Sequence, residues 1–486
     1  MHTSPRVRTL SLLQHCKTSL PTNHITQIHS QLISNDLTQS PTIVARLIQH
    51  YCASKAPHAT HYAHLVIDQF YRHNNGCNPY PLNVLIRCTP PVDSINIFAS
   101  RVSKGTPSFD DFTYIFVLGA CARRVKALWE GLQVHCRVIK HGCVSNVMLQ
   151  TTMIHFYVNS NAYAFARKVF DEMPVRTAAT WNSLIAGYCS RKEYARDGLM
   201  LFVEMLNGKC GVKANDTTVV CVLSAVSRLG TLEMGVSIHG YIEKTVCDVE
   251  NDVYIGTGLV DMYAKCGLLD SALNVFMRMR HKNVHTWTAM VSGLAVHGRG
   301  KQALKFFNDM TDSGISPNSV TFTSLLLACS QAGLVEEGLS LFHNMKNKFG
   351  IVPLPHHYGC IVDLLARAGH LDDAFKFIVG EKVESDEVLW RSLLHACRLH
   401  NDIVMGERVA KILISMQPEL NLEACDRSED YVALSNMCAS AGKWEEVAAV
   451  REAIIDKGIE TNPAVTNYLQ YSYFGFHSSL LLVKIV

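Results

Sequence analysis

The segment Val169-Phe170-Asp171-Glu172-Met173 decides the fold, because close copies of it recur along the chain. Each copy has an aliphatic residue or Phe, then Phe, then two or three mostly polar positions and a Met. The other copies end at Met205, Met279, Met310 and Met345. These methionines lie 32, 74, 31 and 35 residues apart, and the gap of 74 holds two units. A repeat of about 35 residues predicts a repeat architecture.

A longer period contains the shorter one. Gly131-Leu-Gln-Val-His135 is matched by Gly235-Val-Ser-Ile-His239, and Gly338 continues the series, with the glycines 104 and 103 residues apart. An earlier copy of the pattern stands at Gln27-Ile28-His29. Three successive units therefore form one larger repeat.

Each unit has the pattern of a helical hairpin. In residues 259–267 the apolar positions fit one helix face, and Gly267 supplies a left-handed stop. A second helix follows, with apolar residues at spacings of three and four: Leu269, Ala272, Leu273, Phe276 and Met279. Because such a hairpin cannot bury its apolar face alone, hairpins at a fixed period stack into an all-α solenoid.

Composition excludes several classes of protein. Of 486 residues 48% are hydrophobic, which is not typical of a disordered chain. No apolar run approaches the roughly 18 residues of a membrane helix, so we expect no membrane span. The net charge of +3 neither indicates nor excludes nucleic-acid binding. The 17 cysteines form no CxxC pair, so we interpret them as small core residues of a reducing compartment.

The units resemble pentatricopeptide repeats. The resemblance is carried by Thr180-Trp181-Asn182-Ser183-Leu184-Ile185, by Thr286-Trp287-Thr288-Ala289-Met290-Val291, by Met-Tyr-Ala-Lys-Cys-Gly (262–267) and by Val-Phe-Asp-Glu-Met-Pro (169–174). The alternation of long, short and standard units resembles the plant subfamily whose repeats run in triplets (the PLS subfamily). This resemblance implies a right-handed superhelical solenoid of helix-turn-helix repeats.

The resemblance also divides the chain. Residues 1–6 are a short N-terminal segment, 7–78 resemble degenerate repeats, and 79–386 form an array of about nine repeats. We place the units at 79–110, 111–146, 147–177, 178–215, 216–252, 253–283, 284–318, 319–354 and 355–386. Residues 387–463 resemble the repeat-like extension motifs, called E motifs, that follow such arrays. The tail 464–486 departs from the family pattern, and we expect it to be poorly packed.

The resemblance implies that the array binds single-stranded RNA, one repeat per base, through the fifth and last residues of each repeat. An acceptor such as Asp suits the ring N–H of U or G, and the amide of Asn suits the bare ring nitrogen of A or C. A fifth-position Thr or Asn separates purine from pyrimidine in the family's pattern. The candidate base-reading residues are Asn83, Asp110, Thr151, Thr177, Asn182, Asn215, Thr257, Asn283, Thr288 and Asn318.

Pair by pair, these residues predict a target. Asn83 with Asp110 suggests U, and Asn182 with Asn215 suggests C or a pyrimidine. Thr257 with Asn283 and Thr288 with Asn318 each suggest A, whereas Thr151 with Thr177 is off-pattern and Gly359 with Asp386 is uninformative. Three long units carry Ile115, Val220 and Thr323 at the fifth position, and we expect them to act mainly as spacers. The target is 5′-U-n-n-Y-n-A-A-n-n-3′.

Simpler roles compete with base reading. Asn215, Asp252, Asn283 and Asn318 precede helix starts, where Asn and Asp are favoured as N-caps. We expect Trp181 and Trp287 to be packing residues rather than stacking platforms for bases. We also expect His135 and His239 to be packing features rather than ligands.

Signatures of catalysis are missing from the chain. It has neither the H-x-E nor the P-C-x-x-C of the zinc deaminase domain that ends many long relatives. His356, His357 and Cys360 fall on one helix of the last repeat and make a poor metal cluster. We therefore expect a specificity factor that is not itself an enzyme and needs no cofactor or metal.

The leading hypothesis is a site-recognition factor for organellar C-to-U editing of RNA. It would recruit a deaminase in trans, carried by another repeat protein or accessory factor, through residues 387–463. The first acidic residue is Asp36, and the preceding Ser- and Thr-rich stretch suggests a transit segment, mitochondrial first and plastid second. The alternatives are a splicing, stability or translation factor that acts by occupancy, and a tetratricopeptide-like scaffold that binds proteins.

Overall fold

The computed structural model describes residues 22–54, 59–73, 78–105, 109–124, 126–208, 211–245, 251–416, 431–432, 435–436, 438–439 and 442–456. Every regular element in these ranges is a helix, which confirms the all-α prediction. The segment 1–6 and the tail 464–486 lie outside the described residues, as do parts of the degenerate repeats and of the extension motifs. None of the described helices is long and apolar enough to cross a membrane.

The chain divides into two compact units, residues 1–229 and 230–486. The first unit holds the helices α2 (Thr22–Ser34), α3 (Pro41–Ala53), α4 (Ala59–His73), α5 (Tyr80–Cys88), α6 (Pro91–Ser103), α7 (Asp111–Ala122), α8 (Leu128–Lys140), η1 (Cys143–Ser145), α9 (Val147–Asn159), α10 (Tyr163–Glu172), α11 (Ala178–Cys189), α12 (Ala195–Asn207) and α13 (Asp216–Leu229).

The second unit holds the helices α14 (Leu232–Thr245), α15 (Val253–Lys265), α16 (Leu269–Arg278), α17 (Val284–Val296), α18 (Gly300–Asp312), α19 (Ser319–Ala332), α20 (Val335–Asn347), α21 (Pro355–Arg367), α22 (Leu371–Gly380), α23 (Glu387–Leu399), α24 (Ile403–Met416) and α26 (Trp444–Asp456).

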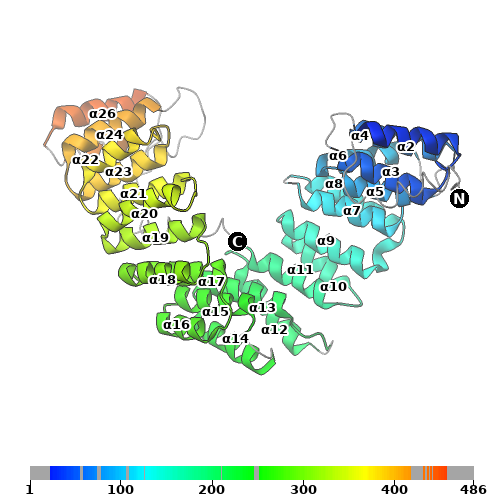
Figure 1. Cartoon of the computed structure of the whole chain (residues 1–486), viewed down its shortest axis with the longest axis horizontal. Coiled ribbons are helices and arrows are strands. Elements are labelled where there is room, and N and C mark those ends of the chain that lie inside the picture. Colours follow the sequence, from blue (N-terminus) through cyan, green and yellow to red (C-terminus); the bar gives the residue numbers. More distant parts are fainter. Residues whose placement is uncertain are drawn as a thin grey trace, which may run out of the picture. The chain divides into compact units, whose positions relative to one another are not determined.

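Within each unit the helices stack as hairpins (Figure 1). In the first unit α9 packs against its hairpin partner α10 and against α7 and α11, the first helices of the adjoining repeats. In the second unit α17 likewise packs against α18, α15 and α19. The first helices of successive repeats therefore form one layer within each unit. The prediction of stacked hairpins is confirmed in both units.

The glycine of the longer period has a packing role. A Cβ at Gly131 would lie 2.0 Å from Cζ of Phe156, and one at Gly338 would lie 2.3 Å from Cδ2 of Leu364. In both cases the second helix of a long repeat meets the first helix of the next repeat. No larger side chain fits at these two contacts, which explains the glycine at both positions.

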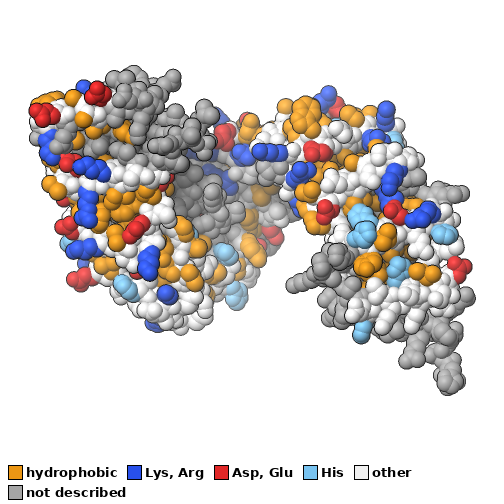
Figure 2. Space-filling view, turned by 90° about the horizontal axis from the view of Figure 1, so that it is seen from above, with side chains coloured by type: hydrophobic (Ala, Val, Ile, Leu, Met, Phe, Trp, Pro, Cys, Tyr) orange, Lys and Arg blue, Asp and Glu red, His pale blue; other side chains and the backbone are white. Residues whose placement is uncertain are grey.

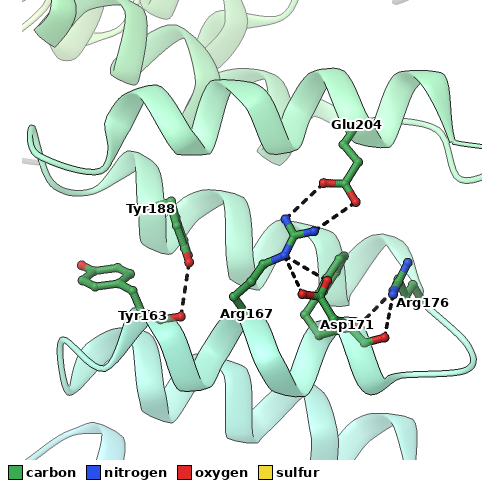
Figure 3. Close-up of polar contacts among 7 residues, drawn as sticks. Tyr163, Arg167, Asp171, Arg176, Tyr188 and Glu204 are labelled. Carbon is green, nitrogen blue, oxygen red and sulfur yellow. Dashed lines mark hydrogen bonds and ion pairs between the residues drawn. The ribbon is translucent and has the colours of Figure 1, made fainter.

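Ion pairs cross-link neighbouring hairpins on the surface (Figure 3). The guanidinium group of Arg167 on α10 contacts Asp171 one turn later and donates two hydrogen bonds, of 3.1 and 3.3 Å, to the carboxylate of Glu204 on α12. Arg176 donates to the carbonyl oxygens of Phe170 and Asp171, which ties the loop before α11 to the end of α10. These contacts fix the loop that carries Thr177.

The conspicuous aromatic and histidine residues pack as expected. Trp181 and Trp287 are buried, with their rings 4.6 and 4.9 Å from those of Phe170 and Phe276. His135 and His239 each bond through Nδ1 to the hydroxyl of a tyrosine on the next first helix, Tyr157 and Tyr263. The interpretation of all four as packing residues is confirmed.

The twelve cysteines that the structure describes are all free thiols. Burial raises the pKa of several of these thiols to about 12, among them Cys121, Cys189, Cys329 and Cys397. A thiol with so high a pKa is protonated at neutral pH and is a poor nucleophile or ligand. These residues therefore act as small apolar parts of the core.

Candidate RNA-binding surface

The last residue of a repeat is the N-cap of the first helix in the next repeat. Oδ1 of Asn283 accepts a hydrogen bond from the backbone N–H of Thr286 (3.0 Å), and Oδ1 of Asn318 accepts one from Thr321 (2.9 Å). Each Thr hydroxyl in turn accepts the backbone N–H of its Asn, at 3.4 and 3.2 Å. Side-chain caps are also made by Asp110, Asn146, Thr177, Asn215, Asp252 and Asp386. Helix capping is confirmed at the four positions where it competed with base reading.

Capping occupies only one of the two terminal atoms of these side chains. Because the backbone N–H requires an acceptor, the amide oxygen of Asn283 and Asn318 faces the helix, and Nδ2 remains. Nδ2 of either residue has no hydrogen-bond partner within the described parts of the chain, and both side chains are partly exposed. At Asp110, Oδ1 accepts the hydrogen bonds from Asn83 and Thr113, and Oδ2 accepts none from described residues. These three caps therefore each leave one donor or acceptor atom available.

Two fifth-position asparagines bond directly to the cap that follows. Nδ2 of Asn83 donates to Oδ1 of Asp110, and Nδ2 of Asn182 donates to Oδ1 of Asn215, each at 2.9 Å. The partners are 27 and 33 residues apart in sequence, yet they meet at the junction of two repeats. The structure therefore brings together the paired residues that the resemblance assigns to one base. Asn215 also caps α13, since its Oδ1 accepts the backbone N–H of Thr218 at 3.1 Å.

Three fifth-position threonines reach the same junction through a second threonine. The Oγ1 atoms of Thr151, Thr257 and Thr288 lie 3.1, 2.7 and 2.8 Å from the hydroxyl of the Thr that follows the next cap by three residues. Thr288 is 7% exposed and Thr257 is partly exposed. The pairs Thr151–Thr177, Thr257–Asn283 and Thr288–Asn318 are thus linked indirectly.

The long units lack this arrangement. Ile115 is buried, Val220 has no polar atom in its side chain, and the hydroxyl of Thr323 donates to the carbonyl of Ser319 in its own helix. The amide of Asn146, the last residue of unit 111–146, donates to Asp111 at 2.7 Å, so one of its two N–H groups is already engaged. These contacts favour the interpretation of the long units as spacers.

Sequence analysis missed exposed apolar side chains that stand beside caps in both units. They stand two residues after an Asn or Asp that precedes a first helix, and Tyr254 is 73% exposed. The others are Tyr80, Phe112, Met148 and Val388. Such side chains offer flat or apolar contact surfaces for unpaired bases. An isolated apolar residue at a helix start belongs to no periodic pattern, so periodicity does not detect these residues. Their constant position, two residues after the Asn or Asp, is the sequence feature that could have identified them.

No metal-binding group of three His, Cys, Asp or Glu side chains occurs among the described residues. His357 is fully buried, and both of its ring nitrogens are engaged. Nδ1 accepts the backbone N–H of Leu354 and Nε2 donates to the carbonyl of Ser319, each at 2.9 Å. His357 thereby takes the place of the Thr that stands at this position in other repeats.

Acid should weaken the second unit through His357. Burial lowers the pKa of its imidazole from 6.5 to about 4, so only the unfolded chain takes up a proton between these values. Protonation of His357 in the unfolded chain therefore lowers the free energy of unfolding once the pH falls below 6.5. The loss reaches roughly 3 kcal/mol at pH 4. Urea unfolding at pH 7 and 4.5 should show a smaller loss for His357→Thr than for the natural chain. Equal losses would show that His357 is not the responsible group.

Comparisons with known proteins agree with this architecture. A model described as PPR repeat matches residues 179–210, 257–284 and 320–348, and one described as PPR repeat family matches 282–331. A pentatricopeptide repeat-containing protein of Arabidopsis thaliana is 45% identical over 469 residues, which cover 94% of this chain and 98% of that protein. Another from the same plant, named as chloroplastic/mitochondrial, is 33% identical and covers 97% of this chain and 74% of its own length.

Solved structures share the fold. The crystal structure of the pentatricopeptide repeat protein PPR10 in complex with an 18-nt psaJ RNA element superposes with a TM-score of 0.66 at 16% identity. The match covers 89% of this chain and 63% of that chain. The crystal structure of the pentatricopeptide repeat protein PPR10 from maize gives a TM-score of 0.56 at 16% identity, over 89% of this chain and 67% of that chain.

Proposed function

Because the chain belongs to the pentatricopeptide repeat family, we propose that it binds single-stranded RNA in a sequence-specific manner, one repeat per base. The observation that carries this proposal is the unused atom on the caps. Nδ2 of Asn283 and Asn318 and Oδ2 of Asp110 recur at equivalent positions, are partly exposed, and differ in hydrogen-bond character. A donor at two junctions and an acceptor at another is what selection among bases requires.

The base assignments follow from these atoms. Oδ2 of Asp110 accepts the N3–H of U, and Nδ2 of Asn283 and of Asn318 donates to N1 of A. At the junction of Asn182 and Asn215, Oδ1 of Asn215 is occupied and Nδ2 remains as the donor for N3 of C. The proposed target is 5′-U-n-n-Y-n-A-A-n-n-3′, with exposed apolar side chains such as Tyr254 flanking the bases.

Charge plays a smaller part in this proposal. The net charge is +3, and on the face shown in Figure 2 the Lys and Arg side chains are scattered rather than gathered in one patch. Lys265 and Arg367, at the ends of first helices, pair with Asp261 and Asp363 one turn earlier. Exposed pairs of this kind are weak, so the cations can exchange their partners for phosphates. Because the net charge is small and these cations are scattered, we assign most of the affinity for RNA to the base contacts.

In the cell, we propose that the protein selects sites for organellar C-to-U editing and is not itself the catalyst. The triplet pattern of the repeats supports membership of the PLS subfamily, and the segments around Trp390 and Trp444 support E-type extension motifs. We assign recruitment of a deaminase in trans to residues 387–463. The mitochondrion is our first choice of compartment, and the plastid is the second.

A direct test compares single-stranded and duplex RNA of the proposed sequence. Pairing hides the Watson–Crick edges of all four bases that the array reads. Since each edge contact contributes about 1 kcal/mol or more, the single strand should bind more than about 100-fold tighter. A gel-shift titration at fixed salt measures both affinities. Equal affinity would overturn the proposed function.

A further inference from the structure

One buried threonine recurs at five repeat junctions. It is the third residue of a first helix, its side chain is fully buried at each junction, and its hydroxyl lies between the cap before it and the fifth residue of the preceding repeat. The five are Thr113, Thr180, Thr218, Thr286 and Thr321. Because this hydroxyl is fully buried and contacts both base-reading residues, it can hold their side chains in place.

Hydrogen-bond accounting shows what the hydroxyl does between Asn182 and Asn215. The Oγ1 of Thr218 accepts the backbone N–H of Asn215 (3.1 Å), and its single proton has two acceptors within reach, Oδ1 of Asn182 at 2.5 Å and Oδ1 of Asn215 at 2.9 Å. We assign the proton to the nearer oxygen, that of Asn182. Nδ2 of Asn182 donates to Oδ1 of Asn215 (2.9 Å). The amide of Asn182 is thus held at both ends, by a donor at its oxygen and an acceptor at its nitrogen. Thr113 holds Asn83 in the same way.

The cap has a second anchor that the fifth residue lacks. Oδ1 of Asn215 also accepts the backbone N–H of residue 218 (3.1 Å), and that bond does not need the Thr side chain. Removal of the hydroxyl therefore leaves the side chain of Asn215 as the cap of α13, although the backbone N–H of Asn215 loses an acceptor. It leaves Oδ1 of Asn182 without its donor. At a Thr-type junction the hydroxyl of Thr321 also contacts both residues: it donates to Oδ1 of Asn318 (3.0 Å) and lies 2.8 Å from the hydroxyl of Thr288.

We propose that this buried threonine is a positioning residue for base selection, which makes the recognition unit of a repeat three residues rather than two. The inference rests on the proposed RNA-binding function. The threonine sets the purine–pyrimidine choice made by the fifth residue, because it holds that side chain in place. The threonine does not set the second choice, between bases that carry a ring N–H (U and G) and bases that do not (A and C). That choice is made by the cap, which has its own anchor.

The test uses Thr218→Val, which keeps the shape and the backbone N–H and removes the hydroxyl. Binding is measured at fixed salt to four RNAs that differ only at the base opposite repeat 178–215. The preference for pyrimidine over purine should fall about fivefold or more, while the preference for C over U stays within about twofold. Thr218→Ser should restore the natural ratios. Ser227→Ala, which removes another buried hydroxyl from α13, should leave both ratios unchanged.

The outcomes separate the inference from the function on which it rests. A natural chain with no base preference at this position overturns the proposed function. If the natural chain prefers pyrimidine at this position and Thr218→Val keeps that preference unchanged, the inference is overturned and the proposed function stands. Equal loss of both preferences in Thr218→Val, with no rescue by Thr218→Ser, also overturns it, because the threonine would then be only a part of the core.

Discussion

Replacing Asn318 by Asp should reverse the base preference of repeat 284–318 from A to G. In the natural chain Oδ1 of Asn318 caps α19 and Nδ2 is available as a donor. Asp keeps the capping oxygen and presents an acceptor in place of the donor, which suits the N1–H of guanine rather than the bare N1 of adenine. Each contact of this kind contributes about 1–3 kcal/mol, so affinity for A should fall by about 5- to 150-fold.

The measurement is binding to four RNAs that differ at that base alone, at one salt concentration. Asp caps helices about as well as Asn, so thermal unfolding of the variant should match that of the natural chain. Base preferences opposite the other repeats should not move and serve as internal controls. An unchanged ratio of A to G affinity would show that Asn318 is only a helix cap.

The largest effect on stability is expected at Trp390. Its side chain is 1% exposed, its Nε1–H donates to the carbonyl of Glu384 (2.7 Å), and its ring lies 5.2 Å from that of Phe375. Trp390→Ala opens a cavity and leaves that carbonyl without its donor, which should cost about 3–5 kcal/mol. Trp390→Phe keeps the aromatic contact and should lose less.

Hydrogen exchange is the suitable readout for Trp390, because repeat arrays open locally rather than all at once. The amides of α22 to α24 should exchange faster in Trp390→Ala. Trp129 on α8 is 75% exposed and provides the matched control, since Trp129→Ala should change stability by less than about 0.5 kcal/mol. Unchanged exchange in α22 to α24 would contradict the assigned role of Trp390.

The fold was predictable because periodicity and glycine placement are local signals. Gly267 was predicted as a helix stop, and its φ of 91° lies in the left-handed region. The reason for a glycine at position 131 requires the structure, because it is the ring of Phe156 that occupies the space of a Cβ there. Helix pairs and their order therefore follow from sequence, whereas the contacts between pairs require coordinates.

The candidate site was predictable only in part. Residue types and spacing identify Asn318 as a cap or a base reader, but not that one atom can serve each role. That conclusion depends on hydrogen bonds across a junction, such as those from Thr321, which the sequence does not specify. Tyr254, which is 73% exposed, was missed because it stands at a helix start, outside any periodic apolar pattern.

The central claim is that the array selects a single-stranded RNA sequence through its cap and fifth residues. Its most direct test is selection from a pool of RNAs with nine randomised positions, followed by sequencing of the bound fraction. The account predicts enrichment of U, then a pyrimidine three positions later, then two adjacent adenines after one further position. A bound pool with no enrichment, or with enrichment at positions assigned to the long units alone, would contradict it.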